Sequence, residues 1–423
     1  MKIYENIEKN FNIIYPNNEK ATYSSILNFS EDLTKPIQRW FKYKEGYSIE
    51  LIQKIIDENK LKSGIILDPF SGSGTTLLGA NYNKIKGIGF EVNPFSYFMS
   101  QVKLHNYTAY EIKEIESNIK IVLSLENNYI GELPKREMMK NVFTQNTEIK
   151  FMKVKYNIIN LNVSDNTKRV FLLGWVSLIE IYSNYRKSGN GLKKRNVKVK
   201  HEEKNDFIKD LETLYLNILI DIKSNSIKFD SKIINDTCLN MDKYIKDETI
   251  DGIIFSPPYA NCFDYTEIYK LELWFGDFVN NNNDLKNLRS KSLRSHLNSN
   301  LKQSDYIISN SLEIIMKELL EKKLWDKRIP TMIRLYFNDM FVLLNKLFNS
   351  LKKNGFCNII VSNSAYGGIV IPTDLLIAEY AVSIGFQLEK IEVDRYIITS
   401  SQQYRKTLEY KKYLRESIIC LRK

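Results

Sequence analysis

The sequence predicts an α/β protein with one doubly wound sheet, into which a helical segment is inserted. Short apolar runs alternate with helical patterns in both halves of the chain, and three of these runs end in residues suited to ligand binding. The middle of the chain has long helical patterns instead. With 423 residues, of which 43% are hydrophobic, the chain can build a large core and differs from disordered proteins.

The first part of the chain contains a βαβ unit, preceded by a loop and an amphipathic helix. An apolar run is followed by a turn of small residues, a helical pattern and a second apolar run, which is the order of two parallel strands with a crossover helix. The predicted elements are a strand over 65–67, a turn over 71–74, a helix over 75–82 and a strand over 85–90 that ends at Glu91.

The stretch 107–228 is predicted to be a mainly helical insertion. Long patterns rich in Lys and Asn dominate it, for example over 170–182, and it contains a basic, glycine-bearing segment over 185–195. The alternation of strands and helices resumes after this stretch. Residues 1–106 and 229–423 are therefore predicted to form one discontinuous domain.

The second half of the chain supplies the remaining strands of the predicted sheet. They lie over 232–234, 250–255, 356–362, 388–393 and 417–421, with helices over 331–351 and 374–384, so the sheet has six or seven strands in all. The polar stretch 280–305 is predicted to be a mobile loop, which carries the basic residues Arg289, Lys291 and Arg294.

A first candidate site follows the strand over 65–67. Gly72 and Gly74 allow a tight turn and a close approach of the backbone to a ligand, and Glu91 ends the next strand, where an acid accepts hydrogen bonds from ribose hydroxyls. A phosphate-binding P-loop would need Lys where Thr75 stands, and a dinucleotide fingerprint would need a third glycine where Leu77 stands. A glycine turn with a structural purpose remains the other interpretation.

A second candidate site follows the strand over 250–255 and reads Ser256-Pro257-Pro258-Tyr259. Two prolines fix the backbone and remove two N–H donors, which makes a rigid corner. Ser256 and the Pro257 carbonyl can accept hydrogen bonds from an exocyclic amine, and Tyr259 can stack on a flat ring. The alternative is an ordinary proline turn with an exposed tyrosine.

Together these residues resemble the amino-group DNA methyltransferases, which bind S-adenosylmethionine. The glycine turn and Glu91 resemble motifs I and II of that family, the Ser256 corner resembles its catalytic motif IV, Asp236 matches its motif III, and the segment 36–41 resembles its motif X. The resemblance implies a Rossmann-like doubly wound mixed sheet of the class I methyltransferase type. The implied cofactor-binding residues are Asp68, Pro69, Phe70, Ser71, Gly72, Gly74, Thr75, Glu91, Asp236, Trp40 and Phe41.

The same resemblance implies the reaction. The Ser form of motif IV is associated with the N4 amine of cytosine, and the Asp or Asn forms with the N6 amine of adenine. The implied enzyme is a site-specific DNA (cytosine-N4-specific) methyltransferase that flips its target base out of the duplex and belongs to a restriction–modification system. The motif order departs from that of many N4-cytosine enzymes, so adenine N6 and an RNA base remain alternatives.

Residues around the corner are candidates for catalysis and substrate binding. Phe263 is expected to clamp the target base together with Tyr259. Asp264 and Glu267 are either general bases or acids that start a helix. Phosphate contacts are expected from Arg186, Lys187, Lys193, Lys194 and Arg195. The loop 280–305 and the polar, basic segment 401–406 are further candidates for DNA contact.

Composition restricts the partners. The net charge of +11 permits a polyanion such as double-stranded DNA. The 4 cysteines form no CxxC pair and the 3 histidines are isolated, so we expect no metal, no disulfides and a cytoplasmic protein. The sequence has no apolar run long enough for a membrane span. A cognate restriction endonuclease is an expected partner. A DNA-binding module without catalysis and a nucleotide-dependent oxidoreductase are the competing functions.

Overall fold

The computed structural model describes residues 2–17, 27, 29–44, 46–127, 129, 141–189, 191–195, 206–302, 306–397 and 407–423. The predicted segment 401–406 and His201 lie outside these residues. Within the described part, no helix is long and apolar enough to cross a bilayer.

The main sheet has eight strands in the order β1-β11-β12-β8-β7-β2-β3-β6, and only β12 runs antiparallel to its neighbours. This arrangement confirms the predicted doubly wound mixed sheet. All seven predicted strands are present, and the two-residue strand β1 is too short to give a pattern. The bounds are β1 (Ile13–Ile14), β2 (Ile65–Asp68), β3 (Lys86–Phe90), β6 (Ser231–Ile234), β7 (Ile250–Phe255), β8 (Leu351–Ser362), β11 (Gln387–Tyr396) and β12 (Arg415–Arg422).

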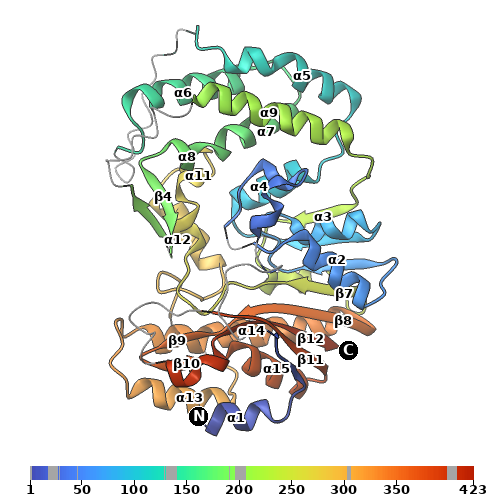
Figure 1. The fold of residues 1–423 in the computed structure, drawn as a ribbon, viewed down its shortest axis with the longest axis vertical. Helices are drawn as coiled ribbons and strands as arrows, with labels where there is room; N and C mark the ends of the chain where they lie inside the picture. Colours follow the sequence, from blue (N-terminus) through green and yellow to red (C-terminus); the bar gives the residue numbers. More distant parts are fainter. Residues whose placement is uncertain are drawn as a thin grey trace.

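Helices cover both faces of this sheet (Figure 1). Leu67 and Ile253 point to one face and Ile66 and Ile254 to the other, as the period-2 geometry of strands requires. The first face packs on α1 (Lys2–Glu8), α13 (Asn310–Leu320), α14 (Ile329–Ser350) and α15 (Thr373–Ser383). The second face packs on α2 (Ile49–Glu58) and α3 (Thr75–Tyr82). Both faces are buried, so the strands read as continuous apolar runs.

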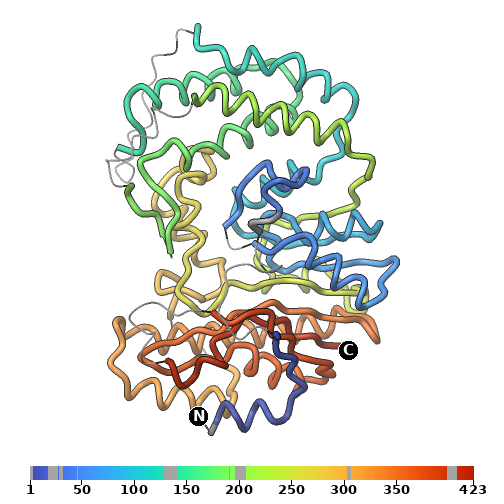
Figure 2. The backbone as a smooth tube through the Cα atoms, viewed as in Figure 1, coloured from blue at the N-terminus to red at the C-terminus, as the bar shows by residue number. Residues whose placement is uncertain are grey.

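A layer of helices lies at the opposite end of the molecule from α1 (Figure 2). It consists of α5 (Ala109–Leu123), α6 (Gln145–Asn160), α7 (Asp165–Ser177), α8 (Ile179–Tyr182) and α9 (Phe207–Ser224). The basic segment is a hairpin of β4 (Tyr185–Ser188) and β5 (Gly191–Lys194). This layer shares one apolar core with α4 (Pro94–Lys103), α11 (Lys270–Phe275) and α12 (Asn282–Lys291).

The prediction that 280–305 is a mobile loop is wrong for its first part, because α12 lies there. Asn281 and Asp284 form a capping box at its start, and Leu285 and Leu288 bury their side chains in the core of the helical layer. Two apolar residues among ten give no clear helical period, so tertiary packing decides this helix. The remaining elements are η1 (Phe29–Thr34), η2 (Gln38–Trp40), η4 (Cys238–Lys243), α10 (Tyr265–Ile268), β9 (Ser364–Tyr366), β10 (Ile369–Ile371) and η5 (Leu408–Tyr413).

Candidate active site

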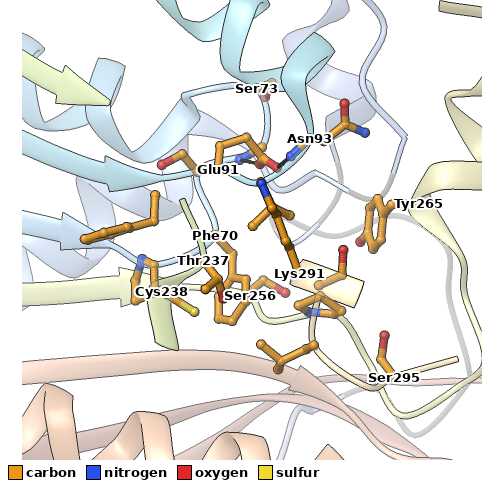
Figure 3. A pocket seen from close by; sticks show the side chains of 18 of the residues that line it. Phe70, Ser73, Glu91, Asn93, Thr237, Cys238, Ser256, Tyr265, Lys291 and Ser295 are labelled. Carbon is orange, nitrogen blue, oxygen red and sulfur yellow. Dashed lines mark hydrogen bonds between the residues drawn. The ribbon is translucent and has the colours of Figure 1, made fainter. Parts of the chain in front are cut away.

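The carboxyl ends of neighbouring parallel strands bring the two sequence motifs together. Strands β2 and β7 pair directly, so the glycine turn after β2 and the Ser256 corner after β7 lie at one edge of the sheet. Strand β3 adds Glu91 and β6 adds Asp236 at the same edge. These segments line one cavity, which we call the first cavity (Figure 3). Of the predicted site residues it contains Pro69, Phe70, Ser71, Gly72, Thr75, Glu91, Asp236, Ser256 and Pro258.

The glycine turn needs its glycines. Gly72 has φ +50° and Gly74 has φ +81°, both in the left-handed region. A Cβ on Gly72 would also meet the ring of Tyr43 at 3.1 Å. The Ser100 hydroxyl donates to the Gly72 carbonyl oxygen at 2.8 Å and holds the turn from behind.

Two carboxyl groups lie next to this turn, those of the half-buried Glu91 and the fully buried Asp68. Glu91 accepts hydrogen bonds from the backbone nitrogens of Gly72 (2.8 Å) and Asn93 (2.7 Å). Burial raises the pKa of Glu91 to about 7, against the effect of these hydrogen bonds. Asp68 is fully buried and accepts from the Tyr47 hydroxyl at 3.1 Å, and burial raises its pKa to about 6.

The motif III acid belongs to a polar cluster of its own. Asp236 accepts from the backbone nitrogen of Thr237 at 2.8 Å and from the Tyr244 hydroxyl at 2.9 Å. Burial opposes its ionisation, but these hydrogen bonds outweigh burial and lower the pKa of Asp236. It is therefore an ionised acceptor in the lining of the first cavity.

The motif X segment, 36–41, does not place Trp40 in the first cavity, although Trp40 was expected to bind the cofactor. Trp40 is only 1% exposed, and its indole nitrogen donates to Asp221 on α9 at 2.8 Å. Phe41 packs edge-on against Phe95, with ring centroids 5.0 Å apart. No residue of 36–41 is among the described residues that line the first cavity; Tyr43, two residues beyond the segment, lines it instead. Tyr47 follows it there, and the sequence gives no signal for either tyrosine beyond proximity to the motif.

Ser256 lies at the junction of two cavities. It lines the first cavity and also a larger second cavity of about 710 Å³ between the sheet and the helical layer. Tyr259 lines the second cavity and donates its hydroxyl proton to Glu416 on β12 at 2.7 Å. The backbone oxygen of Ala260 accepts from Ser364 (2.8 Å) and Tyr366 (2.9 Å), which holds the corner rigidly.

The basic hairpin does not present all its cations to solvent. Lys187 is 4% exposed, forms an ion pair with Glu272 and lies over the rings of Phe41 and Tyr269. Arg195 donates to backbone oxygens of the hairpin, including that of Tyr185 at 3.1 Å. Both line the second cavity. The exposed cations of the hairpin are Arg186, Lys193 and Lys194.

The acids after the corner have structural partners. Asp264 caps the start of α10 and accepts from Arg289 at 2.8 Å. Burial opposes ionisation of Asp264, but the charges of His296 and Arg289 keep its pKa low, so it is a poor proton acceptor. This favours the helix-starting interpretation. Phe263 is buried against Tyr265, with ring centroids 4.7 Å apart.

The cations predicted to contact DNA from the stretch 280–305 also have internal roles. Arg289 donates to Asp264 and Glu267, and Arg294 pairs with Asp339 on α14. Lys291 lines the first cavity instead (Figure 3). In the part of the chain that the structure describes, no three His, Cys, Asp or Glu side chains converge as a metal site would require.

Comparison with known proteins agrees with this geometry. A family model described as DNA methylase, for N6 and N4 methylation, matches residues 4–101. The type II methyltransferase M.AvaI of a Nostoc species is 30% identical over 403 residues, which cover 87% of this chain and 83% of that protein. M.BsoBI of Geobacillus stearothermophilus is 28% identical, with coverages of 91% and 85%, and M.MvaI of Kocuria varians is 25% identical, with coverages of 78% and 76%. The chain therefore belongs to the type II DNA methyltransferases.

Proposed function

We propose that the chain methylates the exocyclic N4 amine of cytosine in duplex DNA, with S-adenosylmethionine as the cofactor. The observation that carries this proposal is the position of Ser256 between the two cavities. A group there reaches a methyl donor on one side and a target base on the other. The serine in the first position of the corner supports cytosine N4 over adenine N6.

The first cavity fits the proposed cofactor. Glu91 is placed to accept hydrogen bonds from ribose hydroxyls, Asp236 is an acceptor for an adenine amine, and Phe70 offers a ring face. Gly72 leaves its part of the cavity lining without a side chain, and the Glu91 carboxyl in the lining favours a cationic ligand. S-adenosylmethionine would supply an electrophilic methyl group when bound.

The chain's own groups prepare the nucleophile. An aromatic amine is a weak nucleophile because its lone pair is delocalised into the ring. Ser256 Oγ and the Pro257 carbonyl oxygen would accept its two protons in hydrogen bonds and favour a pyramidal nitrogen with an available lone pair. This is catalysis by positioning and electrostatics.

The second cavity suits a base that has left the helix. A stacked base cannot reach Ser256, so the target nucleotide must rotate out of the duplex. Tyr259 lines this cavity beside Ser256, and Lys44 and Arg195 lie along its wall. Arg186, Lys193 and Lys194 on the exposed hairpin would contact phosphates. A cognate endonuclease with the same recognition site would complete a restriction–modification system, as the type II relatives suggest.

Methyl transfer to duplex DNA tests the proposal directly. The full chain is incubated with cofactor labelled on its methyl group and with duplex DNA, and the DNA is digested to nucleosides. We expect labelled N4-methylcytosine. Labelled N6-methyladenine would contradict the target base, and label in RNA but not in DNA would contradict the substrate class. The same DNA should resist an endonuclease that cuts at the modified site.

A further inference from the structure

A chain of hydrogen bonds leads from the Ser256 corner to a buried ion pair on the neighbouring strands. The Ser256 hydroxyl donates to the Tyr259 hydroxyl oxygen at 3.3 Å, and the Tyr259 hydroxyl donates to Glu416 Oε1 at 2.7 Å. The other oxygen of Glu416 accepts from Arg395 through Nε at 2.7 Å and Nη2 at 2.6 Å. Glu416 is 4% exposed, so water does not compete for these bonds.

The number of available protons determines the direction of donation along this chain of hydrogen bonds. An ionised carboxylate only accepts hydrogen bonds, so Tyr259 must give its single hydroxyl proton to Glu416. Tyr259 then has no proton for Ser256, and the Ser256 hydroxyl must be the donor between them. The lone pairs of Ser256 Oγ are left to face the cavities. Any N–H of a target amine meets an acceptor there and not a competing proton.

The ion pair with Arg395 keeps the Glu416 carboxylate, at the end of the chain of hydrogen bonds, a hydrogen-bond acceptor. Burial raises the pKa of Glu416, and the Arg395 guanidinium and the Tyr259 hydroxyl oppose this rise. A guanidinium only donates, so it needs an oxygen opposite it at this position. The pair therefore sets which atom of residue 416 faces Arg395 and which faces Tyr259.

The geometry points to Glu416 as a positioning residue that acts through Tyr259 to make Ser256 an acceptor for the target amine. Glu416 lies 157 residues from Tyr259 in the sequence and outside both motifs. This inference rests on the proposed function, since it assigns Ser256 the acceptor role in methyl transfer. It adds Arg395 as the group that holds Glu416 in its charged state.

The Glu416→Gln variant tests the direction of donation along these hydrogen bonds, because glutamine has nearly the same shape as glutamate. Because Arg395 requires the amide oxygen, the amide nitrogen faces Tyr259 and donates to it. Tyr259 then donates to Ser256, and the Ser256 proton turns toward the target amine. We expect kcat to fall roughly 10- to 100-fold, as for a misdirected buried hydrogen bond. The cofactor Kd should stay within about twofold, because Glu416 lines the second cavity and does not line the cofactor cavity.

Adding Tyr259→Phe to Glu416→Gln gives a result that a structural role does not predict. The double variant removes the reversed donor, Ser256 can again turn its proton away, and kcat should rise above that of Glu416→Gln alone. Glu409→Gln, an exposed position before β12, is the matched control and should behave as the unmodified chain. A double variant slower than Glu416→Gln overturns the inference.

The outcomes separate the inference from the proposed function. Full turnover by Ser256→Ala would overturn the proposed function itself. Wild-type kcat in Glu416→Gln, with Ser256→Ala inactive, would overturn only the role of Glu416. Thermal unfolding shows whether the Glu416→Gln variant folds. If it does not, Tyr259→Phe alone interrupts the chain of hydrogen bonds and leaves the Glu416–Arg395 ion pair in place. A several-fold loss of kcat is expected, and wild-type kcat there overturns the inference.

Discussion

The carboxylate of Glu91, at the end of β3, accepts a hydrogen bond of 2.8 Å from the backbone nitrogen of Gly72 in the turn after β2. The two residues come from adjacent parallel strands, so sheet pairing places the acid against the turn. This contact holds the floor of the first cavity in place before any ligand binds. It also couples the charge of Glu91 to the backbone that a cofactor would approach.

Cofactor affinity should therefore depend on pH. Burial raises the pKa of Glu91 to about 7, so the free protein holds the neutral acid only below this pH, whereas a ribose hydroxyl donates best to the ionised carboxylate. Affinity should rise as pH increases through this value and fall by up to about tenfold per pH unit below it. Calorimetric titration with S-adenosylmethionine measures this.

The variant Glu91→Gln isolates the contribution of that group. It should bind the cofactor more weakly at neutral pH, and its affinity should depend less on pH. The pH dependence that remains should reflect the ionisation of Asp68, whose pKa is about 6. Glu50→Gln, at an exposed ion pair with Lys35, is the control and should keep the original profile. An unchanged profile in Glu91→Gln would remove Glu91 from the cofactor site.

Ser256→Ala should lower turnover by about 100-fold or more, because the target amine loses its hydroxyl acceptor. Cofactor affinity should be unchanged, since the cavity wall loses a single oxygen atom. Single-turnover methylation and equilibrium cofactor binding measure the two effects separately. Loss of both together would indicate a structural role for Ser256.

The two classes of cation in the hairpin should respond differently to substitution. Lys187→Met leaves Glu272 buried without its partner and should destabilise the fold by about 3–5 kcal/mol in chemical denaturation. Lys193→Met removes an exposed charge and should change stability by at most about 0.5 kcal/mol. It should instead reduce the salt dependence of DNA binding by about one counterion. Equal stability of both variants would contradict the buried assignment of Lys187.

Asp221 should be a stability determinant that ties the segment before β2 to the helical layer. It accepts from the backbone nitrogen of Ile37 at 2.9 Å, from Arg39 and from the Trp40 indole. Asp221→Ala should cost about 2–4 kcal/mol, since three donors lose their acceptor. Glu116→Ala breaks an exposed pair with Lys223 and should cost at most about 1 kcal/mol. If both variants lost similar amounts of stability, Asp221 would contribute no more than an exposed ion pair does.

The sheet and the chemistry at its edge follow from local sequence patterns. The strands are continuous apolar runs because helices bury both faces, and the glycines of 71–74 mark a turn that requires positive φ. Helix α12 was missed because its amphipathic pattern is weak, and the hairpin β4–β5 because its strands are short and basic. In both cases packing against the helical layer decides the structure.

The sequence alone determined that the glycine turn, Glu91, Asp236 and the Ser256 corner gather at one edge of the sheet, because parallel strands place their carboxyl ends side by side. The tertiary structure alone decided the partners of the charged and polar side chains. Lys187 meets Glu272 across 85 residues, Tyr259 meets Glu416 across 157, and Trp40 meets Asp221 across 181. Such pairs depend on how distant elements pack, and this packing determines whether each charge faces solvent or supports the fold.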